Sequence, residues 1–335
     1  MPKERLATEA IMAARAARCG PVPDISPEAL ASDDPEPRLA AFRRHYANFE
    51  IKTPKVIERT LDRGWMIPFL TAADMGMHRR WEHWFKIMMA GQLIDEPIPQ
   101  LHYGPAFPRV RKMLDFSLDC VPRSGSWLGM GRERILEYFV DWILYGFGWS
   151  GMKELPKEPQ GCEGASMRLY QTFGLDWLQL WPHDYFGDYL EEIHYGQGVS
   201  FFRTPWEVAW MMTQMTMMPT GHEDPTELRT KTVCDPCVGT GIFLICASNF
   251  SYRLFGMDIS HLISKVCVLN LYLYAPWGAK PFPFLEEARQ EAEPERNGHL
   301  PALPEPILEL PAPRRIEAVR AIARKPRLKR PLARV

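Results

Sequence analysis

The sequence predicts an α/β fold in which a small parallel-sheet core follows a mainly helical region. Two short β-like runs, residues 231–234 and 252–257, alternate with helix-like segments. A strand, helix, strand, helix order of this kind is typical of a parallel sheet. Before these runs, apolar residues recur at three- and four-residue spacing over much of 39–183, which indicates helices.

The helical region contains three segments with clear periodicity. We expect helices over residues 57–65, 72–91 and 132–145, separated by Gly- and Pro-rich stretches. One face of the second helix carries four large apolar side chains, Trp81, Trp84, Phe85 and Met88. Such a face predicts packing against a core rather than exposure to water.

The α/β part begins with a helix that we expect over residues 206–218, directly after Thr204 and Pro205. Further helices are expected over 242–249 and from Ser260, as N-cap, to about residue 274. The first helix contains a methionine-rich run, Met211 to Met218. We interpret this run as core packing, and the alternative is a soft-ligand or partner-binding groove.

Composition divides the chain into four regions. Residues 1–38 are predicted to form an N-terminal helix and linker, 39–183 a helical domain, and 184–280 the α/β domain. Residues 281–335 are Pro-rich, acidic at first and then basic, with nine Lys or Arg from Arg314 onward. Such a composition rarely builds a packed core, so we expect a disordered tail.

The chain of 335 residues is 46% hydrophobic, which is ample for a buried core. Its net charge of -1 says nothing about nucleic acid, although the basic end suggests either a solubilising tail or phosphate binding. The start has no apolar segment typical of a secretory signal, and no apolar run reaches membrane-spanning length. We therefore expect a cytoplasmic protein with reduced cysteines and no membrane partner.

The strongest motif lies between the two β-like runs. Gly239 and Gly241 allow a tight turn at the start of a helix, and Asp235 and Asp258 end the two runs. An acid after the second strand can accept hydrogen bonds from both ribose hydroxyls of a nucleoside. A dinucleotide fingerprint requires a small residue where Leu244 stands, so we favour S-adenosylmethionine over NAD.

Residues 235–244 read Asp-Pro-Cys-Val-Gly-Thr-Gly-Ile-Phe-Leu, which resembles motif I of N6-adenine DNA methyltransferases. The likeness is strongest to the methylase (M) subunits of type I restriction-modification systems. Residues 255–259 resemble their motif II and 198–205 their motif X. Residues 184–191 resemble the segment that leads into motif X, and 270–274 the Asn-Leu helix after motif II.

This resemblance implies a partial Rossmann-like core of an S-adenosylmethionine-dependent methyltransferase. It implies DNA as a partner, together with a specificity subunit or a complementary methylase subunit. It also implies that the cofactor-binding residues are Thr204, Pro205, Asp235, Pro236, Gly239, Gly241 and Asp258.

The sequence departs from the family where the chemistry takes place. These enzymes act on a flipped base and use an Asn/Asp/Ser-Pro-Pro-aromatic string, motif IV. The chain contains no Pro-Pro pair, so no catalytic residue is nominated. We expect a truncated or catalytically incomplete DNA adenine methyltransferase. The alternative is a non-catalytic nucleic-acid-binding or adaptor protein of a mobile element or phage, with a vestigial cofactor pocket. Cys234 and Cys237 lack further ligands at zinc spacing, so no metal is expected.

Overall fold

The computed structural model describes residues 62–285, apart from 126, 128–130, 194–201 and 218–224. The chain divides into two compact units, Met1–Glu287 and Ala288–Val335, and every described residue belongs to the first. The helix and linker expected over 1–38, and all but the first residues of the expected tail, lie outside the described residues. The division at residue 183 stays a prediction.

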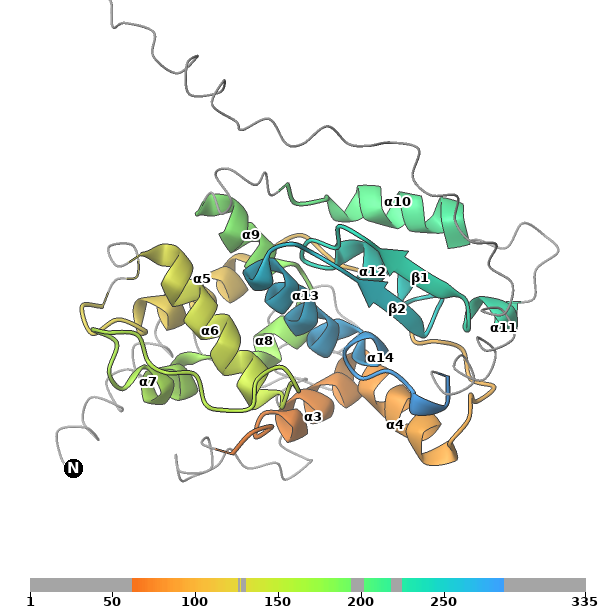
Figure 1. Cartoon of the computed structure of the whole chain (residues 1–335), viewed down its shortest axis with the longest axis horizontal. Coiled ribbons are helices and arrows are strands. Elements are labelled where there is room, and N and C mark those ends of the chain that lie inside the picture. The colour runs from red at the N-terminus through yellow and green to blue at the C-terminus, as the bar shows by residue number, and fades with distance from the viewer. Residues whose placement is uncertain (1–61, 126, 128–130, 194–201, 218–224, 286–335) are drawn as a thin grey trace, which may run out of the picture. The chain divides into compact units, whose positions relative to one another are not determined.

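The first half of the described chain is helical (Figure 1). Its helices are α3 (Ile67–Met77), α4 (Arg80–Ala90), α5 (Pro108–Asp119), α6 (Arg132–Gly146), α7 (Ala165–Thr172), α8 (Leu175–Leu180) and α9 (Tyr185–Glu192). The helix predicted over 132–145 is confirmed as α6. None of the helices in the described ranges is long and apolar enough to span a bilayer.

The prediction of a single helix over 72–91 is wrong, because the helix is interrupted between α3 and α4. Arg79 adopts a left-handed conformation with φ of 58°. The carboxylate of Asp74, in α3, accepts a hydrogen bond of 2.6 Å from the backbone N–H of Trp81 in the first turn of α4. An acid that satisfies a free N–H of this kind stabilises a new helix start. In the helix predicted over 57–65, the described residues 62–65 form bends and turns.

The second half contains α10 (Trp206–Met217), α11 (Pro225–Leu228), β1 (Thr232–Asp235), α12 (Ile242–Ala247), β2 (Arg253–Gly256), α13 (His261–Tyr274) and α14 (Pro276–Ala279). β1 and β2 pair in parallel, with Thr232 opposite Arg253 and Asp235 opposite Gly256. The predicted strand, helix, strand, helix order is confirmed, and Ser260 caps α13 as expected. The sheet has two strands in the described residues, so a larger Rossmann-like core stays a prediction.

The two faces of this sheet differ in burial. Val233 and Leu254, which are partners in the register, are both buried. Leu254 lies against α14, where a Cβ added at Gly278 would be 3.3 Å from its Cδ1 atom. Cys234 lies on the opposite face and is exposed. Over the described residues, the face of the sheet at Cys234 is thus exposed, whereas the face at Val233 and Leu254 is buried.

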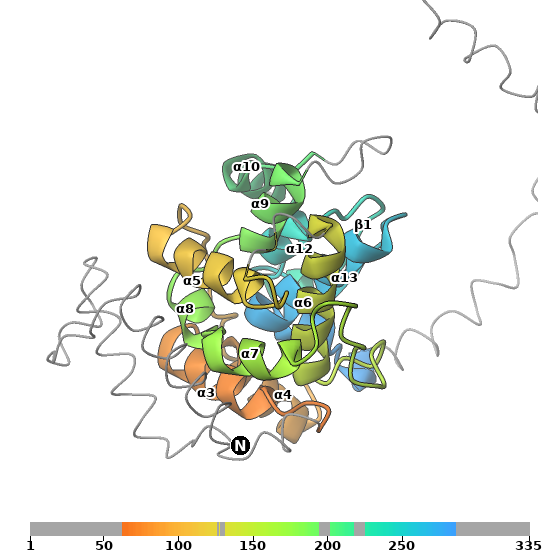
Figure 2. The same ribbon diagram turned by 90° about the vertical axis from the view of Figure 1, so that its left-hand side faces the viewer.

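The helical half packs on the β-α-β unit through buried polar contacts as well as apolar ones. The Trp81 indole donates to the carbonyl of Tyr272 at 3.0 Å. The Gln179 amide donates to the carbonyl of Leu273 at 2.9 Å. α6 also lies alongside α13, as both views show (Figures 1 and 2). These contacts attach α13, the helix that follows β2, to the helical region.

Candidate functional site

The loop that leaves β1 turns back toward the end of β2. The carbonyl of Asp235 accepts a hydrogen bond from the N–H of Met257 at 3.0 Å, and the N–H of Val238 donates to the Met257 carbonyl at 2.9 Å. The Asp235 side chain accepts from the N–H of Cys237 at 3.0 Å. The loop therefore stays beside residue 257, with Pro236 and Cys237 exposed at its tip.

Asp258 lies between this loop and the start of α13. One carboxylate oxygen accepts the N–H of Gly239 at 3.1 Å, and the other accepts the N–H of Ser260 at 2.9 Å. The carboxyl ends of parallel strands share one edge of a sheet, which is where open α/β sheets bind their ligands. The structure thus brings together four of the sequence-predicted residues, Asp235, Pro236, Gly239 and Asp258, at that edge.

The two glycines of the loop serve different purposes. Both have positive φ, 54° at Gly239 and 88° at Gly241. A Cβ added at Gly241 would lie 2.8 Å from the sulfur of Cys267, so close packing against α13 requires glycine there. A Cβ added at Gly239 would meet no atom within 4 Å. The space beside Gly239 is therefore open to a ligand, whereas Gly241 holds the loop against the core.

A buried carboxylate, Asp184, holds the loop through its residue Thr240. Asp184, which is 1% exposed and caps α9, accepts a hydrogen bond from the Thr240 hydroxyl at 2.5 Å. Its other oxygen accepts the Asn270 amide at 2.9 Å, and the same amide donates to the Thr240 carbonyl at 2.9 Å. Three segments that resemble methyltransferase motifs are thus joined by one hydrogen-bond network.

Burial raises the pKa of Asp184 above its usual range, while the bonds from Thr240, Asn270 and the Gly187 N–H oppose that shift. Each of these hydrogen bonds favours the charged carboxylate and so limits the rise in pKa that burial causes. Sequence reasoning did not nominate Asp184, Thr240 or Asn270 as site residues. We interpret them as positioning residues, because Asp184 and Asn270 hold Thr240, a residue of the loop, through buried hydrogen bonds.

Thr204 and Pro205, the remaining predicted residues, lie exposed immediately before α10. The Pro205 carbonyl accepts the N–H of Ala209 at 3.1 Å, which begins the helix. The neighbouring Arg203 forms a salt bridge of 3.0 Å with Asp188 of α9. This ion pair connects the segment that resembles motif X with α9. Arg203 is thereby held against α9. The role of Thr204 and Pro205 in cofactor binding stays a prediction.

Two exposed apolar side chains flank Asp258 and were not recognised in the sequence. Met257 is 61% exposed and Ile259 is 84% exposed. Large apolar groups beside an acid provide a surface for a flat ring and acceptors for its polar substituents. The sequence shows only that Met257 and Ile259 flank Asp258 directly after a strand. That pattern is equally compatible with buried and with exposed side chains.

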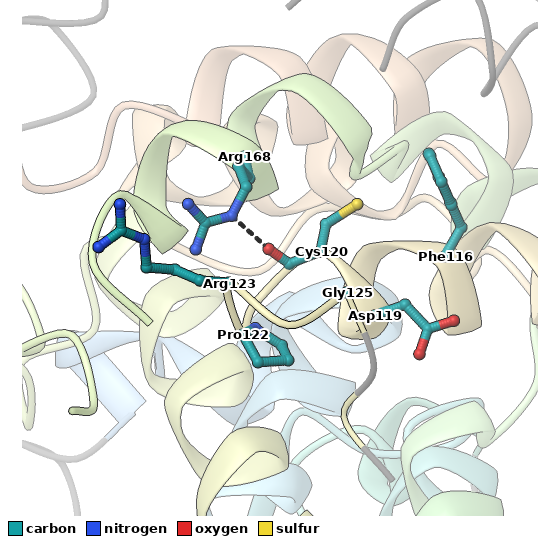
Figure 3. Close-up of a pocket in the computed structure, with 7 residues that line it drawn as sticks. All are labelled: Phe116, Asp119, Cys120, Pro122, Arg123, Gly125 and Arg168. Atoms are coloured by element: carbon teal, nitrogen blue, oxygen red, sulfur yellow. Dashed lines mark hydrogen bonds between the residues drawn. The ribbon is translucent and has the colours of Figure 1, made fainter. Parts of the chain in front are cut away.

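A separate pocket of about 340 Å³ lies between α5 and α7, lined by Cys120, Arg123 and Arg168 among others (Figure 3). The Arg168 guanidinium donates to the carbonyls of Cys120, Val121, Cys162 and Glu163. The guanidinium therefore binds backbone carbonyls at the end of α5, in the following loop and before α7. We interpret it as a structural group and not as an anion-binding one. In the part of the chain that the structure describes, no group of three or more His, Cys, Asp or Glu is placed to hold a metal.

No protein-family model, curated protein or solved structure matches the chain. The likeness to N6-adenine methyltransferases therefore depends on the order of the motifs in the sequence. The chemistry of the site depends on the contacts of Asp235, Gly239 and Asp258 described above.

Proposed function

We propose that the loop 235–241 and Asp258 bind S-adenosylmethionine, and that the chain is one component of a DNA adenine N6-methyltransferase. The observation that carries this proposal is the placement of Asp258. Its carboxylate is only partly buried, at the end of β2, and it is held by the N–H groups of Gly239 and Ser260. Each carboxylate oxygen retains a lone pair for a further donor.

The chemistry of S-adenosylmethionine fits the groups at this edge. Its two ribose hydroxyls are donors for Asp258, and its adenine ring has the flat apolar faces that Met257 and Ile259 suit. Its α-amino group is a cationic donor for Asp235 or for a backbone carbonyl of the loop. A dinucleotide has no such amino group, and Leu244 stands where its fingerprint requires a small residue. These features favour S-adenosylmethionine over NAD.

Calorimetric titration tests this binding. The intact chain should bind S-adenosylmethionine saturably, and Asp258→Ala should weaken binding about tenfold to a hundredfold, the scale of a lost hydrogen bond to a charged group. Glu154→Ala, which removes an exposed carboxylate elsewhere, should leave the affinity unchanged. No heat at millimolar ligand, or equal affinity for NAD, would contradict the proposal.

We further propose that the chain does not methylate DNA alone and that a complementary subunit supplies the base-binding half. An adenine amine must be placed about 3 Å from the methyl carbon with acceptors on its hydrogens. The sequence contains no motif IV to provide them. The exposed face of the sheet at Cys234 is compatible with coverage by another polypeptide.

Transfer of tritiated methyl groups to unmethylated DNA tests this division of labour. Label should appear only when the products of neighbouring genes are added, and Gly241→Trp should abolish it, because no side chain fits beside Cys267. Transfer by the purified chain alone would contradict the claim. If label never appears but DNA binding persists, the chain is a non-catalytic nucleic-acid-binding adaptor.

We also propose that residues 314–334 bind DNA through phosphates. Nine Lys or Arg are accompanied there by Glu317 as the single acid. Deleting 311–335 should remove most duplex binding, and binding by the intact chain should weaken steeply with salt, because counterions are released. Deleting the acidic, Pro-rich residues 286–310 is the matched control and should not reduce binding. Equal binding by both deletions would limit the basic segment to a solubilising role.

A further inference from the structure

Helix α10 carries apolar side chains on two opposite faces. Ala209, Thr213 and Met217 form one face, which is buried and packs on α12. The second face is exposed. It consists of Val208, Met211, Met212 and Met215, which are 42%, 54%, 49% and 79% exposed, and we call it the outer stripe.

The outer stripe has the spacing of a helix-packing surface. Its members follow one another at i, i+3, i+4 and i+7, so they line one side of the helix. With 100° per residue, that side lies opposite Thr213 and Met217. A helix that is apolar all round is normally buried on all sides. In the ribbon, α10 lies at the outside of α12 (Figures 1 and 2). Over the described residues, the side chains of the stripe are exposed.

The prediction that the run Met211 to Met218 packs in the core is therefore wrong for Met211, Met212 and Met215. Met217 is 7% exposed and does pack in the core. The outer stripe is not the solvated, charged face of an ordinary surface helix, because Glu207 is the one charged residue in α10. Unbranched methionine side chains adapt to an apolar partner surface, which makes this stripe suited to association.

We propose that the outer stripe is the contact surface for a second copy of this chain, with the two α10 helices antiparallel. A two-fold axis between Met211 and Met212 places Val208 opposite the partner subunit's Met215. The shortest side chain of the stripe then faces the most exposed one. The same axis places Glu207 opposite the partner subunit's Thr216, so no like charges meet.

A parallel pair would instead place Glu207 opposite the partner subunit's Glu207, and Met215 opposite the partner subunit's Met215. Like charges and two long side chains at one level both disfavour that arrangement. Both arrangements have two-fold symmetry and use the same patch on both subunits, so charge and side-chain length decide between them. This inference does not depend on cofactor binding or on methylation.

The contact is small. Twelve helical residues span about 18 Å, so one helix pair buries less than a standard protein interface of about 1,600 Å². We therefore expect a weak dimer, with dissociation in the micromolar range. Such a dimer forms at high concentration and separates on dilution, which makes sedimentation over a concentration series the appropriate measurement.

Analytical ultracentrifugation of the intact chain, from about 1 to about 100 µM, tests the pairing. Met215→Glu and Val208→Lys should each raise the dissociation constant at least about tenfold, since each places a charge in the apolar contact. The double variant Val208→Lys with Met215→Glu should restore the dimer. In the antiparallel pair each new lysine faces the partner subunit's new glutamate, and two such pairs form.

Met89→Glu is the matched control, because Met89 of α4 is 87% exposed and lies outside the stripe. It should not change association, and circular dichroism should show that all variants remain folded. A wild-type chain that is monomeric at every concentration would overturn the proposal, as would a dimer unaffected by Met215→Glu. Failure of the double variant to restore dimers would reject the antiparallel arrangement.

Discussion

The two sides of the β-α-β unit are built in contrasting ways. Toward α4, the guanidinium of Arg80 is fully buried and bonded to the Ser248 hydroxyl at 2.7 Å, the Ser248 carbonyl at 3.0 Å and Asn249 at 3.1 Å. At the carboxyl ends of the strands, by contrast, Pro236 and Met257 are exposed. We call the side at Arg80 the closed side and the side at Pro236 and Met257 the open side. Contacts on the closed side hold the unit in place, and the acids Asp235 and Asp258 lie on the open side.

Arg80 shows how strongly the closed side is constrained. Burial lowers the pKa of its guanidinium to about 9, although Asp74 opposes that shift. The guanidinium also lies 4.4 Å from the ring centre of Trp277. A buried charge of this kind is tolerated because hydrogen bonds and the aromatic face replace its water. Removing the guanidinium would take this donor from the buried Ser248 carbonyl and hydroxyl, whereas Asn249 Oδ1 would keep the N–H of Leu101.

The largest effect is expected on the closed side. Arg80→Leu should lower the free energy of unfolding by about 3–5 kcal/mol, because the Ser248 carbonyl and hydroxyl lose their buried charged donor. Urea denaturation measures this change. Arg79→Leu is the matched control, since Arg79 is its exposed neighbour, and it should leave the transition midpoint almost unchanged. Equal effects of the two variants would contradict the contrast between the two sides.

The next effect is a pH dependence from Asp74. Burial raises its pKa to about 7, from 3.8. Between these values the folded chain retains a proton that the unfolded chain releases, so this carboxyl stabilises the fold at low pH and the contribution is lost as pH rises through 7. Burial lowers the pKa of His83 to about 4, which acts in the opposite direction between pH 4 and 6.5.

Asp74→Asn separates the two contributions, because His83 is the same in both proteins. Relative to Asp74→Asn, the wild-type chain should lose up to about 4 kcal/mol of stability between pH 4 and pH 8. Asparagine retains an acceptor for the Trp81 N–H, so the start of α4 is preserved. Denaturation curves at several pH values measure the difference. A difference that is constant with pH would show that Asp74 is not protonated in the fold.

The smallest effects distinguish the two glycines on the open side. Gly241→Ala should lower stability by about 1–3 kcal/mol, because its Cβ meets Cys267 and the φ of 88° is strained. Gly239→Ala should cost about 1 kcal/mol, from φ alone, yet weaken S-adenosylmethionine binding by filling open space. Thermal unfolding together with calorimetry separates stability from binding. Normal binding by Gly239→Ala would place the ligand elsewhere.

Local chemistry made the β-α-β unit predictable from the sequence. Gly239 and Gly241 have positive φ at the predicted turn, and Ser260 caps α13 as predicted. Asp235 is the last residue of β1, and Asp258 follows the last residue of β2 by two positions. These signals lie within a few residues of the structure they determine, so no long-range contact was needed to read them.

Features that depend on distant contacts were not predictable. Asp184 supports Thr240 across 56 positions of sequence and Asn270 across 86, so nothing local identifies this network. The break at Arg79 depends on the Asp74 carboxylate reaching Trp81, which periodicity does not reveal. The methionines of α10 fit a core helix in pattern, and only the exposed fractions of their side chains show that one face is uncovered.

Photo-crosslinking tests the central claim, that the ends of β1 and β2 form an S-adenosylmethionine site, most directly. The intact chain is irradiated with S-adenosylmethionine that carries a tritiated methyl group, and the labelled peptide is mapped by mass spectrometry. The label should fall within residues 232–260 and be displaced by excess unlabelled cofactor but not by NAD. Saturable label confined to another part of the chain, or label that NAD displaces equally well, would contradict the claim.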